Sequence, residues 1–289
     1  PQMFVHDDVK MAIPFIERSH ELGKPFFINL WMHEPHTPFH VDPKLLNKFS
    51  DLDEPDAIYA ATLYHADLRI GELLNALDRI GLADNTLVIF SSDNGPARSV
   101  PAAPLALTYD SATGLGYGIG AAKGITGGRR KYKGSLMEGG IGVPFIARWP
   151  GKIPAGKVDK SNFLSAVDLL PTFCELGGLT LPVDYRPDGV SQVSALMGKE
   201  KGTREKPLFW RMSHGYAIVH QQWKLVSNRK FTTFELFDLV ADPLESKDLS
   251  KLNNEVTQNL IGMIKDWTKS LPENPSGPVF SSLRAEPAK

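Results

Sequence analysis

The stretch TLVIFSSDNGP (residues 86–96) joins an apolar run to a cluster of polar side chains. The run from Thr86 to Phe90 predicts a buried strand, and Asp93 and Asn94 follow it directly. Open α/β sheets bind their ligands at the carboxyl ends of strands, and hard cations prefer carboxylate and amide oxygens. The stretch therefore predicts a divalent-cation site that includes Asp93 and Asn94.

The same Asp-Asn-Gly sequence is also typical of turns, because its side chains bond to nearby backbone and glycine accepts left-handed dihedral angles. A hairpin turn needs a return strand close by, and the residues that follow predict none. Together with the apolar run before it, this favours the metal site over a simple turn.

A second polar cluster, His33-Glu34-Pro35-His36, follows the apolar run 25–30, which predicts another strand. Pro35 restricts the backbone between the two histidines, and this suits side chains that hold a substrate oxygen. Histidines of a solvated surface loop are equally compatible with the pattern.

A third element is Lys133, which ends the cationic run 129–133. Such runs are usually solvated surface. However, Gly134 allows a close approach of the backbone, and a Glu-Gly-Gly turn at 138–140 precedes another apolar run at 143–147. We expect this lysine, the histidine pair and the acidic-amide pair to converge on one bound anion.

The composition is that of an ordinary globular protein, with 289 residues, 42% hydrophobic, 22% charged and a formal net charge of -1. This balance excludes a dedicated nucleic-acid binder. No apolar run approaches the roughly 18 residues of a spanning helix, and residues 1–4 show no signal-peptide pattern, so we expect the chain to start inside a longer protein. The single cysteine, Cys174, excludes an internal disulfide and is expected to be buried.

Apolar periodicity predicts helices that alternate with short strands over much of the chain. Helices are expected at Asp8–Leu22, Asp56–Ile80 and Leu164–Leu176, the second closed by Gly81 and the third interrupted by Pro171. Strands are expected at 26–30, 86–90 and 143–147. This alternation predicts an α/β fold with a mostly parallel sheet flanked by helices.

Residues 97–130 are rich in glycine and proline and show no sustained period. They are too long for an ordinary connection, so we predict a functional loop that selects the substrate. The sequence GYGIGA (116–121) matches a loose dinucleotide-binding fingerprint, but no predicted strand precedes it and no predicted helix follows. We therefore reject a nucleotide site there.

Beyond about residue 201 the pattern changes to short apolar segments separated by polar turns, at 208–210, 216–219, 223–226 and 234–239. They predict an antiparallel sheet, and the periodic run Asn253–Leu271 predicts a final amphipathic helix. We expect two domains: residues 1–203 form the α/β part, and residues 204–289 form a smaller antiparallel subdomain with a terminal helix and tail.

Several motifs, in this order along the chain, resemble those of the type I sulfatases of the alkaline phosphatase superfamily. They are HEPHTP (33–38), SSDNG (91–95), KGS (133–135), EGG (138–140), DLLPT (168–172) and ELFDL (235–239). The resemblance runs through nearly the whole chain and is to the carboxyl-terminal portion of members such as arylsulfatases and N-acetylgalactosamine-6-sulfatases. It implies an alkaline phosphatase-like fold that is incomplete in this chain.

This resemblance implies hydrolysis of sulfate esters, either of sulfated carbohydrates or of aryl sulfates, with a calcium ion and a formylglycine nucleophile. Asp93 and Asn94 match the family's later pair of calcium ligands. His33 and Lys133 match residues that contact the sulfate, and His36 is a secondary candidate. The resemblance also implies export, to the periplasm, the extracellular space or the lysosome.

The chain departs from the family pattern in two respects. The family's two early calcium-binding aspartates have no match here, and no stretch fits the Cys/Ser-x-Pro-x-Arg motif from which formylglycine is made. Calcium takes about six to eight oxygens, so Asp93 and Asn94 alone are expected to hold it weakly. The isolated chain is expected to be inactive and to expose an unpaired sheet edge.

Two alternatives stay open. A phosphoesterase or phosphonate hydrolase of the same superfamily would use a similar metal and lysine for another tetrahedral anion. A non-catalytic protein that binds sulfated glycans would keep the fold without the nucleophile. The expected partner is a sulfated small molecule or glycan, with no nucleic acid and no membrane span.

Overall fold

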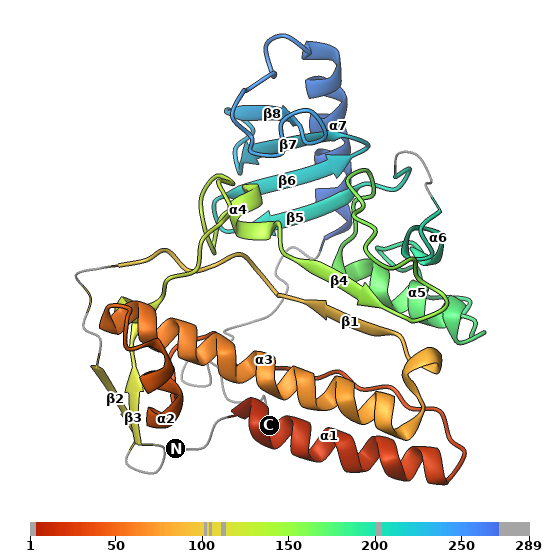
Figure 1. Cartoon of the computed structure of the whole chain (residues 1–289). Coiled ribbons are helices and arrows are strands. Elements are labelled where there is room, and N and C mark those ends of the chain that lie inside the picture. Colours follow the sequence, from red (N-terminus) through yellow and green to blue (C-terminus); the bar gives the residue numbers. More distant parts are fainter. Residues whose placement is uncertain (1–3, 101–102, 104–105, 111–113, 200–203, 272–289) are drawn as a thin grey trace, which may run out of the picture. The chain divides into compact units, whose positions relative to one another are not determined.

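The computed structural model of the chain describes residues 4–100, 103, 106–110, 114–199 and 204–271 (Figure 1). The chain forms two compact units, one from residues 1–158 with 196–198 and the other from residues 159–195 with 199–289. Within the described ranges, no helix has both the length and the apolar character that a membrane crossing requires.

Two long helices, α1 (Phe4–Glu21) and α3 (Glu54–Ile80), pack against each other in the first unit (Figure 1). Val9, Ala12 and Ile16 of α1 are buried, at the three- and four-residue spacing of one helix face. Both long helices that the sequence predicts are thus confirmed.

The ends of α3 are set by local sequence. Asp53 caps the first turn, because its Oδ1 accepts a hydrogen bond from the Asp56 backbone N–H at 2.9 Å. Gly81 ends the helix in the left-handed region, with φ 79°, and donates its N–H to the Asp78 carbonyl at 3.1 Å. The predicted closure by Gly81 is confirmed.

The first unit also contains several shorter helices. They are α2 (Pro43–Leu46), α4 (Glu138–Ile141) and the 3-10 helices η1 (Asn47–Phe49), η2 (Ala83–Asn85) and η3 (Ile119–Ala121). A buried apolar cluster joins several of these segments to α3: Phe39, Val41, Ile58, Ala61, Ala121 and Ala122. The backbone just after the histidine pair is thereby fixed to the core.

The strands of the first unit form two antiparallel pairs. β1 (Val88–Ser91) pairs with β4 (Phe145–Arg148), which confirms the strands predicted around 86–90 and 143–147. β2 (Ala106–Asp110) pairs with β3 (Gly114–Tyr117) inside the segment predicted to be an irregular loop. The structure differs from the prediction there, because backbone hydrogen bonds rather than a periodic apolar pattern define this pair.

The prediction of a mostly parallel sheet is wrong. Every strand pair among the described residues is antiparallel, and residues 26–30 carry no assigned strand. A strand needs a hydrogen-bonded neighbour, which an apolar pattern alone does not supply. The mixture of helices and strands, with an antiparallel sheet and helix towards the carboxyl end, confirms the α/β class.

The second unit contains a four-stranded antiparallel sheet in simple sequential order. Its strands are β5 (Leu208–Met212), β6 (Gly215–His220), β7 (Trp223–Asn228) and β8 (Phe234–Asp238). Helix α7 (Asn254–Ser270) packs on β6 and β7. The predicted antiparallel sheet and final helix are both confirmed.

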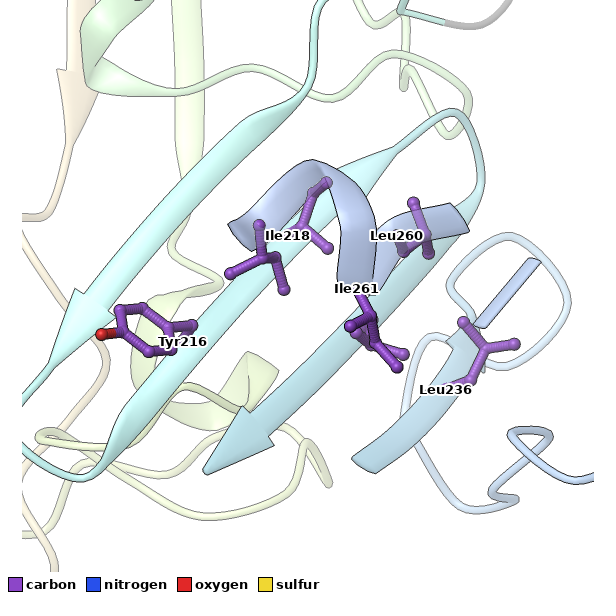
Figure 2. Packing of buried hydrophobic residues seen from close by; sticks show 7 residues of the cluster. Tyr216, Ile218, Leu236, Leu260 and Ile261 are labelled. Atoms are coloured by element: carbon purple, nitrogen blue, oxygen red, sulfur yellow. The ribbon is translucent and has the colours of Figure 1, made fainter. Parts of the chain in front are cut away.

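The core of this unit lies between the sheet and α7. Ile218, Leu225 and Leu236 occupy directly opposed positions on three neighbouring strands, so their side chains share one face. Leu260 and Ile261 of α7 pack against that face (Figure 2). Nearly complete burial of all five side chains makes this the best-defined hydrophobic core of the described chain.

A buried ion pair lies on the opposite face of the sheet from this core. Lys224 of β7 and Glu245 are both fully buried, with Nζ 2.8 Å from Oε1. Lys224 stands directly opposite Val219 and Phe237 in the sheet, so it belongs to the face away from Leu225. The pair joins the middle of the sheet to the loop that follows β8.

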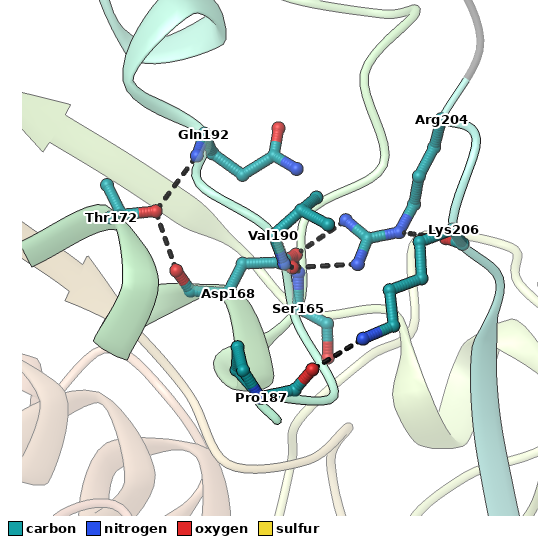
Figure 3. A network of polar contacts seen from close by, with 8 residues as sticks. All are labelled: Ser165, Asp168, Thr172, Pro187, Val190, Gln192, Arg204 and Lys206. Atoms are coloured by element: carbon teal, nitrogen blue, oxygen red, sulfur yellow. Dashed lines mark hydrogen bonds and ion pairs between the residues drawn. The ribbon is translucent and has the colours of Figure 1, made fainter. Parts of the chain in front are cut away.

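A second buried carboxylate ties segment 159–195 to the start of the sheet. Asp168, at the end of η4 (Ala166–Asp168), accepts hydrogen bonds from Arg204 Nη2 and Nη1 at 2.7 and 2.9 Å (Figure 3). The backbone N–H groups of Ser165 and Val190 also donate to this carboxylate, each at 2.9 Å. These bonds explain why 159–195 groups with the carboxyl-terminal sheet; the domain division after residue 203 stays a prediction.

Helix α5 (Leu169–Leu176) is shorter than the predicted helix from residue 164. Pro171 stands in its first turn, where the missing N–H breaks no helical hydrogen bond. Cys174, expected to be buried, is only partly buried. The remaining helix, α6, spans Val193–Leu196.

Candidate functional site

The acidic-amide pair follows the end of β1, as predicted. Asp93 Oδ1 accepts a hydrogen bond from the Asn94 backbone N–H at 2.9 Å, and Asn94 Nδ2 donates to the Gly95 carbonyl at 3.0 Å. Ser92 Oγ donates to the Asn94 carbonyl at 3.1 Å. These contacts use the amide nitrogen of Asn94 and one oxygen of Asp93. They leave hard oxygens of both side chains available to a cation.

Gly95 allows this strand end to pack closely against α4. Its backbone N–H donates to the Gly140 carbonyl at 2.9 Å, and a Cβ placed on Gly95 would lie 2.0 Å from the Gly139 carbonyl oxygen. Gly139 is equally confined, since its own Cβ would lie 2.2 Å from the Lys131 carbonyl oxygen. Glycine is required at these positions because backbone packs directly on backbone.

The same close packing brings Lys133 to the pair. The Lys133 backbone N–H donates to the Pro96 carbonyl at 2.9 Å, and Gly134 follows in the left-handed region with φ 84°. The Lys133 side chain is exposed. Two of the three predicted elements, the strand end and the lysine segment, are therefore neighbours in the structure.

The two histidines form a compact turn of their own. The His36 backbone N–H donates to the His33 carbonyl at 2.8 Å, and the two rings lie 5.8 Å apart between centroids, at 62°. His36 Nδ1 lies 2.6 Å from the Thr37 carbonyl. A carbonyl only accepts, so Nδ1 carries the proton in this contact, and Nε2 is the nitrogen of His36 available to a ligand.

A third histidine, His40, lies close to this turn. It is buried, and burial followed by the charge of the nearby His33 lowers its pKa below the ordinary value of 6.5. The next residue towards the turn, Phe39, bonds to Tyr117 of β3 in both directions at 2.9 Å. The histidine turn is thus anchored to the core. Its convergence with Asp93 on one anion stays a prediction.

A hollow of about 440 Å³ adjoins the lysine segment. Its lining residues are Ser99, Lys123, Gly124, Ile125, Thr126, Gly127, Gly128 and Tyr132. Gly124 packs against the ring of Pro96, since a Cβ there would lie 2.6 Å from the Pro96 Cβ. The end of segment 97–130 therefore lies beside the strand end that carries Asp93.

Sequence reasoning missed the role of Lys123 in this hollow. Its Nζ lies 2.9 Å from Asp56 Oδ1 at the start of α3, and this hydrogen bond raises the pKa of the lysine. The glycine-rich run 124–128 was the available signal, because such runs permit close approach, but the partner on a distant helix has no local signature.

A complete calcium cage is not formed by the described residues. They contain no group of three or more His, Cys, Asp or Glu side chains placed to hold a metal ion. Asp93 and Asn94 fit calcium as hard oxygen donors, but they supply only part of the roughly six to eight oxygens that the ion takes. The residues therefore fit part of a calcium site.

Two protein-family models match the chain. The one described as sulfatase matches residues 4–179, which is more than half of the 289 residues. The one described as N-sulphoglucosamine sulphohydrolase, C-terminal, matches residues 130–271. The two matches overlap and together cover almost all of the described chain.

Individual relatives agree with these matches. The chain is 29% identical over 261 residues to N-acetylgalactosamine-6-O-sulfatase of Bacteroides thetaiotaomicron, covering 84% of this chain and 47% of that protein. It is 32% identical over 198 residues to arylsulfatase G of Rattus norvegicus, covering 68% of this chain and 34% of that protein. The chain thus spans less than half the length of these curated relatives.

A solved structure extends the comparison to three dimensions. The crystal structure of Ps i-CgsB in complex with k-i-k-neocarrahexaose matches with a TM-score of 0.78 and 27% sequence identity. The match covers 94% of this chain and 56% of that one.

Proposed function

This chain belongs to the sulfatase family, and we propose that it supplies the sulfate-contacting and part of the calcium-binding side chains of a sulfuric ester hydrolase. One structural observation supports this most directly. The backbone that follows the Asp93-Asn94 pair contacts both the Lys133 backbone and the Gly139-Gly140 backbone.

In this proposal each side chain has a separate task. Lys133 places a positive charge where negative charge develops on the sulfate oxygens during hydrolysis. His33 holds a sulfate or ester oxygen, and His36 offers Nε2 as a second donor or acceptor. When bound to Asp93 and Asn94, calcium would neutralise charge on the sulfate group.

The nucleophile is not among the residues of this chain. No stretch of the 289 residues fits the Cys/Ser-x-Pro-x-Arg motif, and Cys174 is followed by Glu175 and Leu176. We therefore expect no hydrolysis of 4-nitrophenyl sulfate by the purified chain above the level of a Lys133→Ala variant. Measurable turnover that depends on Lys133 would contradict this expectation.

The substrate class proposed is a sulfated carbohydrate. Two of the relatives point that way, since one is named an N-acetylgalactosamine-6-O-sulfatase and the other was solved with a neocarrahexaose. The hollow at the end of segment 97–130 is the proposed place of substrate selection, because its lining includes Gly124, which packs on Pro96, and Tyr132, the residue before Lys133. Export is proposed from the family resemblance.

The proposed calcium ligands are tested by titrating the 289-residue chain with calcium in a calorimeter. Weak binding, with a Kd on the order of 1 mM, is expected because the cage is partial. Asp93→Asn should abolish the measurable heat, because it removes the only carboxylate of the pair. Asp51→Asn, at an exposed position outside the site, is the matched control. Calcium binding that survives Asp93→Asn would overturn this ligand assignment.

The role of Lys133 is tested with phenyl sulfate as a small sulfate ester that the chain binds without turnover. Lys133→Ala is expected to weaken its binding about ten- to hundredfold, the scale of one charge-assisted hydrogen bond of about 1.5–3 kcal/mol. Lys152→Ala removes an exposed lysine of the same unit and should leave binding unchanged. An equal loss of affinity in the two variants would show that Lys133 acts only as a general surface charge.

A further inference from the structure

A hollow of about 500 Å³ lies on the second unit, at the carboxyl end of α7. Its lining comes from β5 and the turn after it, from the residue that follows β7 and from the end of α7, and it includes Phe209, Arg211, Arg229, Trp267 and Leu271. No acidic residue is among the described residues that line it. The hollow therefore combines an aromatic wall with two guanidinium groups.

The aromatic wall is held in place by ring contacts. Trp267 stacks on Phe209, with ring centroids 4.8 Å apart and 8° between the ring planes. Trp267 also meets Tyr216 edge-on, with centroids 6.5 Å apart. Both arrangements are favoured geometries for aromatic pairs. The indole is thus a preformed apolar surface rather than a mobile side chain.

The two arginines come from different strands. Arg211 lies two residues after Phe209 in β5, so both side chains leave the same face of the sheet, because strand side chains alternate between faces. Arg229 follows the end of β7, and its backbone N–H donates to the His214 carbonyl at 3.3 Å. Both arginines are exposed. Across the residues that the structure describes, neither guanidinium has a hydrogen bond or ion pair.

The two arginines could instead have a purely structural role, as hydrogen-bond donors to the free carbonyl groups at the carboxyl end of α7. That end already has partners of its own. The Leu271 backbone N–H donates to the Thr268 carbonyl at 3.3 Å, and Ser270 Oγ donates to the Trp267 carbonyl at 2.7 Å. The carboxylate of Asp266 pairs with Lys269 at 2.7 Å. Neither guanidinium group bonds to the described part of α7.

We infer that this hollow binds a sulfated saccharide, with a sulfate group held by Arg211 and Arg229 and a sugar ring packed on Trp267. Guanidinium groups bind tetrahedral oxyanions through paired, charge-assisted hydrogen bonds. The C–H faces of a sugar ring are apolar and suit an aromatic surface within a hollow that has few polar groups. The choice of a sulfated sugar over other anions rests on the proposed function.

The test is calorimetric titration of the 289-residue chain with a sulfated carrageenan hexasaccharide. Every protein carries Lys133→Ala, so the proposed sulfate contact of the first unit is weakened equally in all of them. Arg211→Gln and Arg229→Gln are each expected to weaken binding about tenfold, because each removes a charge-assisted hydrogen bond. Lys230→Gln removes the adjacent positive charge, which does not line the hollow, and should change affinity less than about twofold.

Two further ligands, the desulfated hexasaccharide and sodium sulfate, separate the contributions of sugar and anion. Binding of the sulfated hexasaccharide that exceeds both and is lost in the arginine variants supports the inference. Equal binding of the desulfated form, or of sodium sulfate alone, overturns it. Unchanged affinity in both arginine variants, with native thermal stability, also overturns it. None of these readouts depends on sulfatase turnover. Failure of this inference can therefore be distinguished from failure of the proposed function.

Discussion

Gly95 is the residue on which the geometry of the candidate site depends most directly. An added Cβ would lie 2.0 Å from the Gly139 carbonyl oxygen and 3.3 Å from the Gly140 Cα. Both obstacles are backbone, which cannot rotate away as a flexible side chain can. Any side chain at Gly95 must therefore separate the Asp93-Asn94 strand end from α4.

We predict that Gly95→Ala lowers the free energy of unfolding by about 1–3 kcal/mol, the range for overpacking a tight contact. The matched control is Gly71→Ala in α3, where an added Cβ meets nothing within 4 Å. That substitution should stabilise the chain by about 0.5–1 kcal/mol, because alanine is the better helix former. Urea unfolding of both variants measures the difference, and equal effects would argue against the close packing at Gly95.

His40 makes the stability of the first unit depend on pH, and the direction of this dependence follows from its pKa. Burial first, and the charge of His33 second, hold its pKa below the ordinary value of 6.5. As the pH falls through 6.5, the unfolded chain binds a proton at this position before the folded chain does. Stability is therefore retained above 6.5 and is lost as the pH falls towards the lower pKa of the folded state.

We predict that His40→Asn makes the unfolding free energy less dependent on pH between about 7.5 and 5.5. His20→Asn, at an exposed position of α1, should leave the pH dependence of the wild type intact. Denaturant unfolding at several pH values supplies the comparison. A wild-type slope that persists in His40→Asn would show that other groups cause it.

At the scale of elements, patterns with local causes were predictable from the sequence. The boundaries of α3 follow from the capping aspartate Asp53 and from Gly81. The carboxyl-terminal sheet was predictable because its strands alternate over short segments between polar turns. By contrast, residues 26–30 have the apolar pattern of a strand without a described partner, and the β2–β3 pair has partners without the pattern. Strand pairing is a property of two segments, so one segment cannot predict it.

The candidate site likewise contains features that local sequence predicts and features that depend on distant partners. The sequence indicated Asp93, Asn94 and Lys133 by their motifs, and the structure brings their backbone segments together. The ion pair of Lys123 with Asp56 and the buried bonds of Asp168 were not predictable. Each of them joins segments that are distant in sequence, and an isolated aspartate in a helical pattern carries no sign of its partner.

The bonds of Asp168 join three separate segments of the chain, around residues 165–168, 190 and 204, so their loss should affect the second unit as a whole. We predict that Arg204→Met lowers the free energy of unfolding by about 3 kcal/mol, because it leaves a buried carboxylate without its cation. Arg186→Met, which removes an exposed arginine, should change it by less than about 0.5 kcal/mol. Thermal and urea unfolding measure both variants.

A double variant separates charge from packing at this position. Asp168→Asn together with Arg204→Met removes both members of the pair, and it should recover part of the stability lost by Arg204→Met alone. A double variant that is less stable than the sum of the two single losses would instead assign the effect to packing around Arg204.

At the scale of the whole molecule, the β1–β4 ladder is a surface through which the chain can associate. It is a two-stranded sheet with no third strand among the described residues. Phe90 and Ile146 stand directly opposite each other, so their side chains share one face, and they are 44% and 60% exposed. An unpaired strand edge beside exposed apolar side chains is a template for pairing with another copy of the chain.

We predict that the purified chain self-associates as its concentration rises, and that Ile146→Lys shifts it towards the monomer, because a charged side chain on an edge strand opposes pairing. Val183→Lys is the matched control, since Val183 is 91% exposed but lies outside any strand. Size-exclusion chromatography with light scattering across a concentration series gives the mass of each variant. A wild-type chain that stays monomeric throughout would rule out association through this edge, and an equal response to both lysine substitutions would attribute the effect to net charge instead of the β1–β4 ladder.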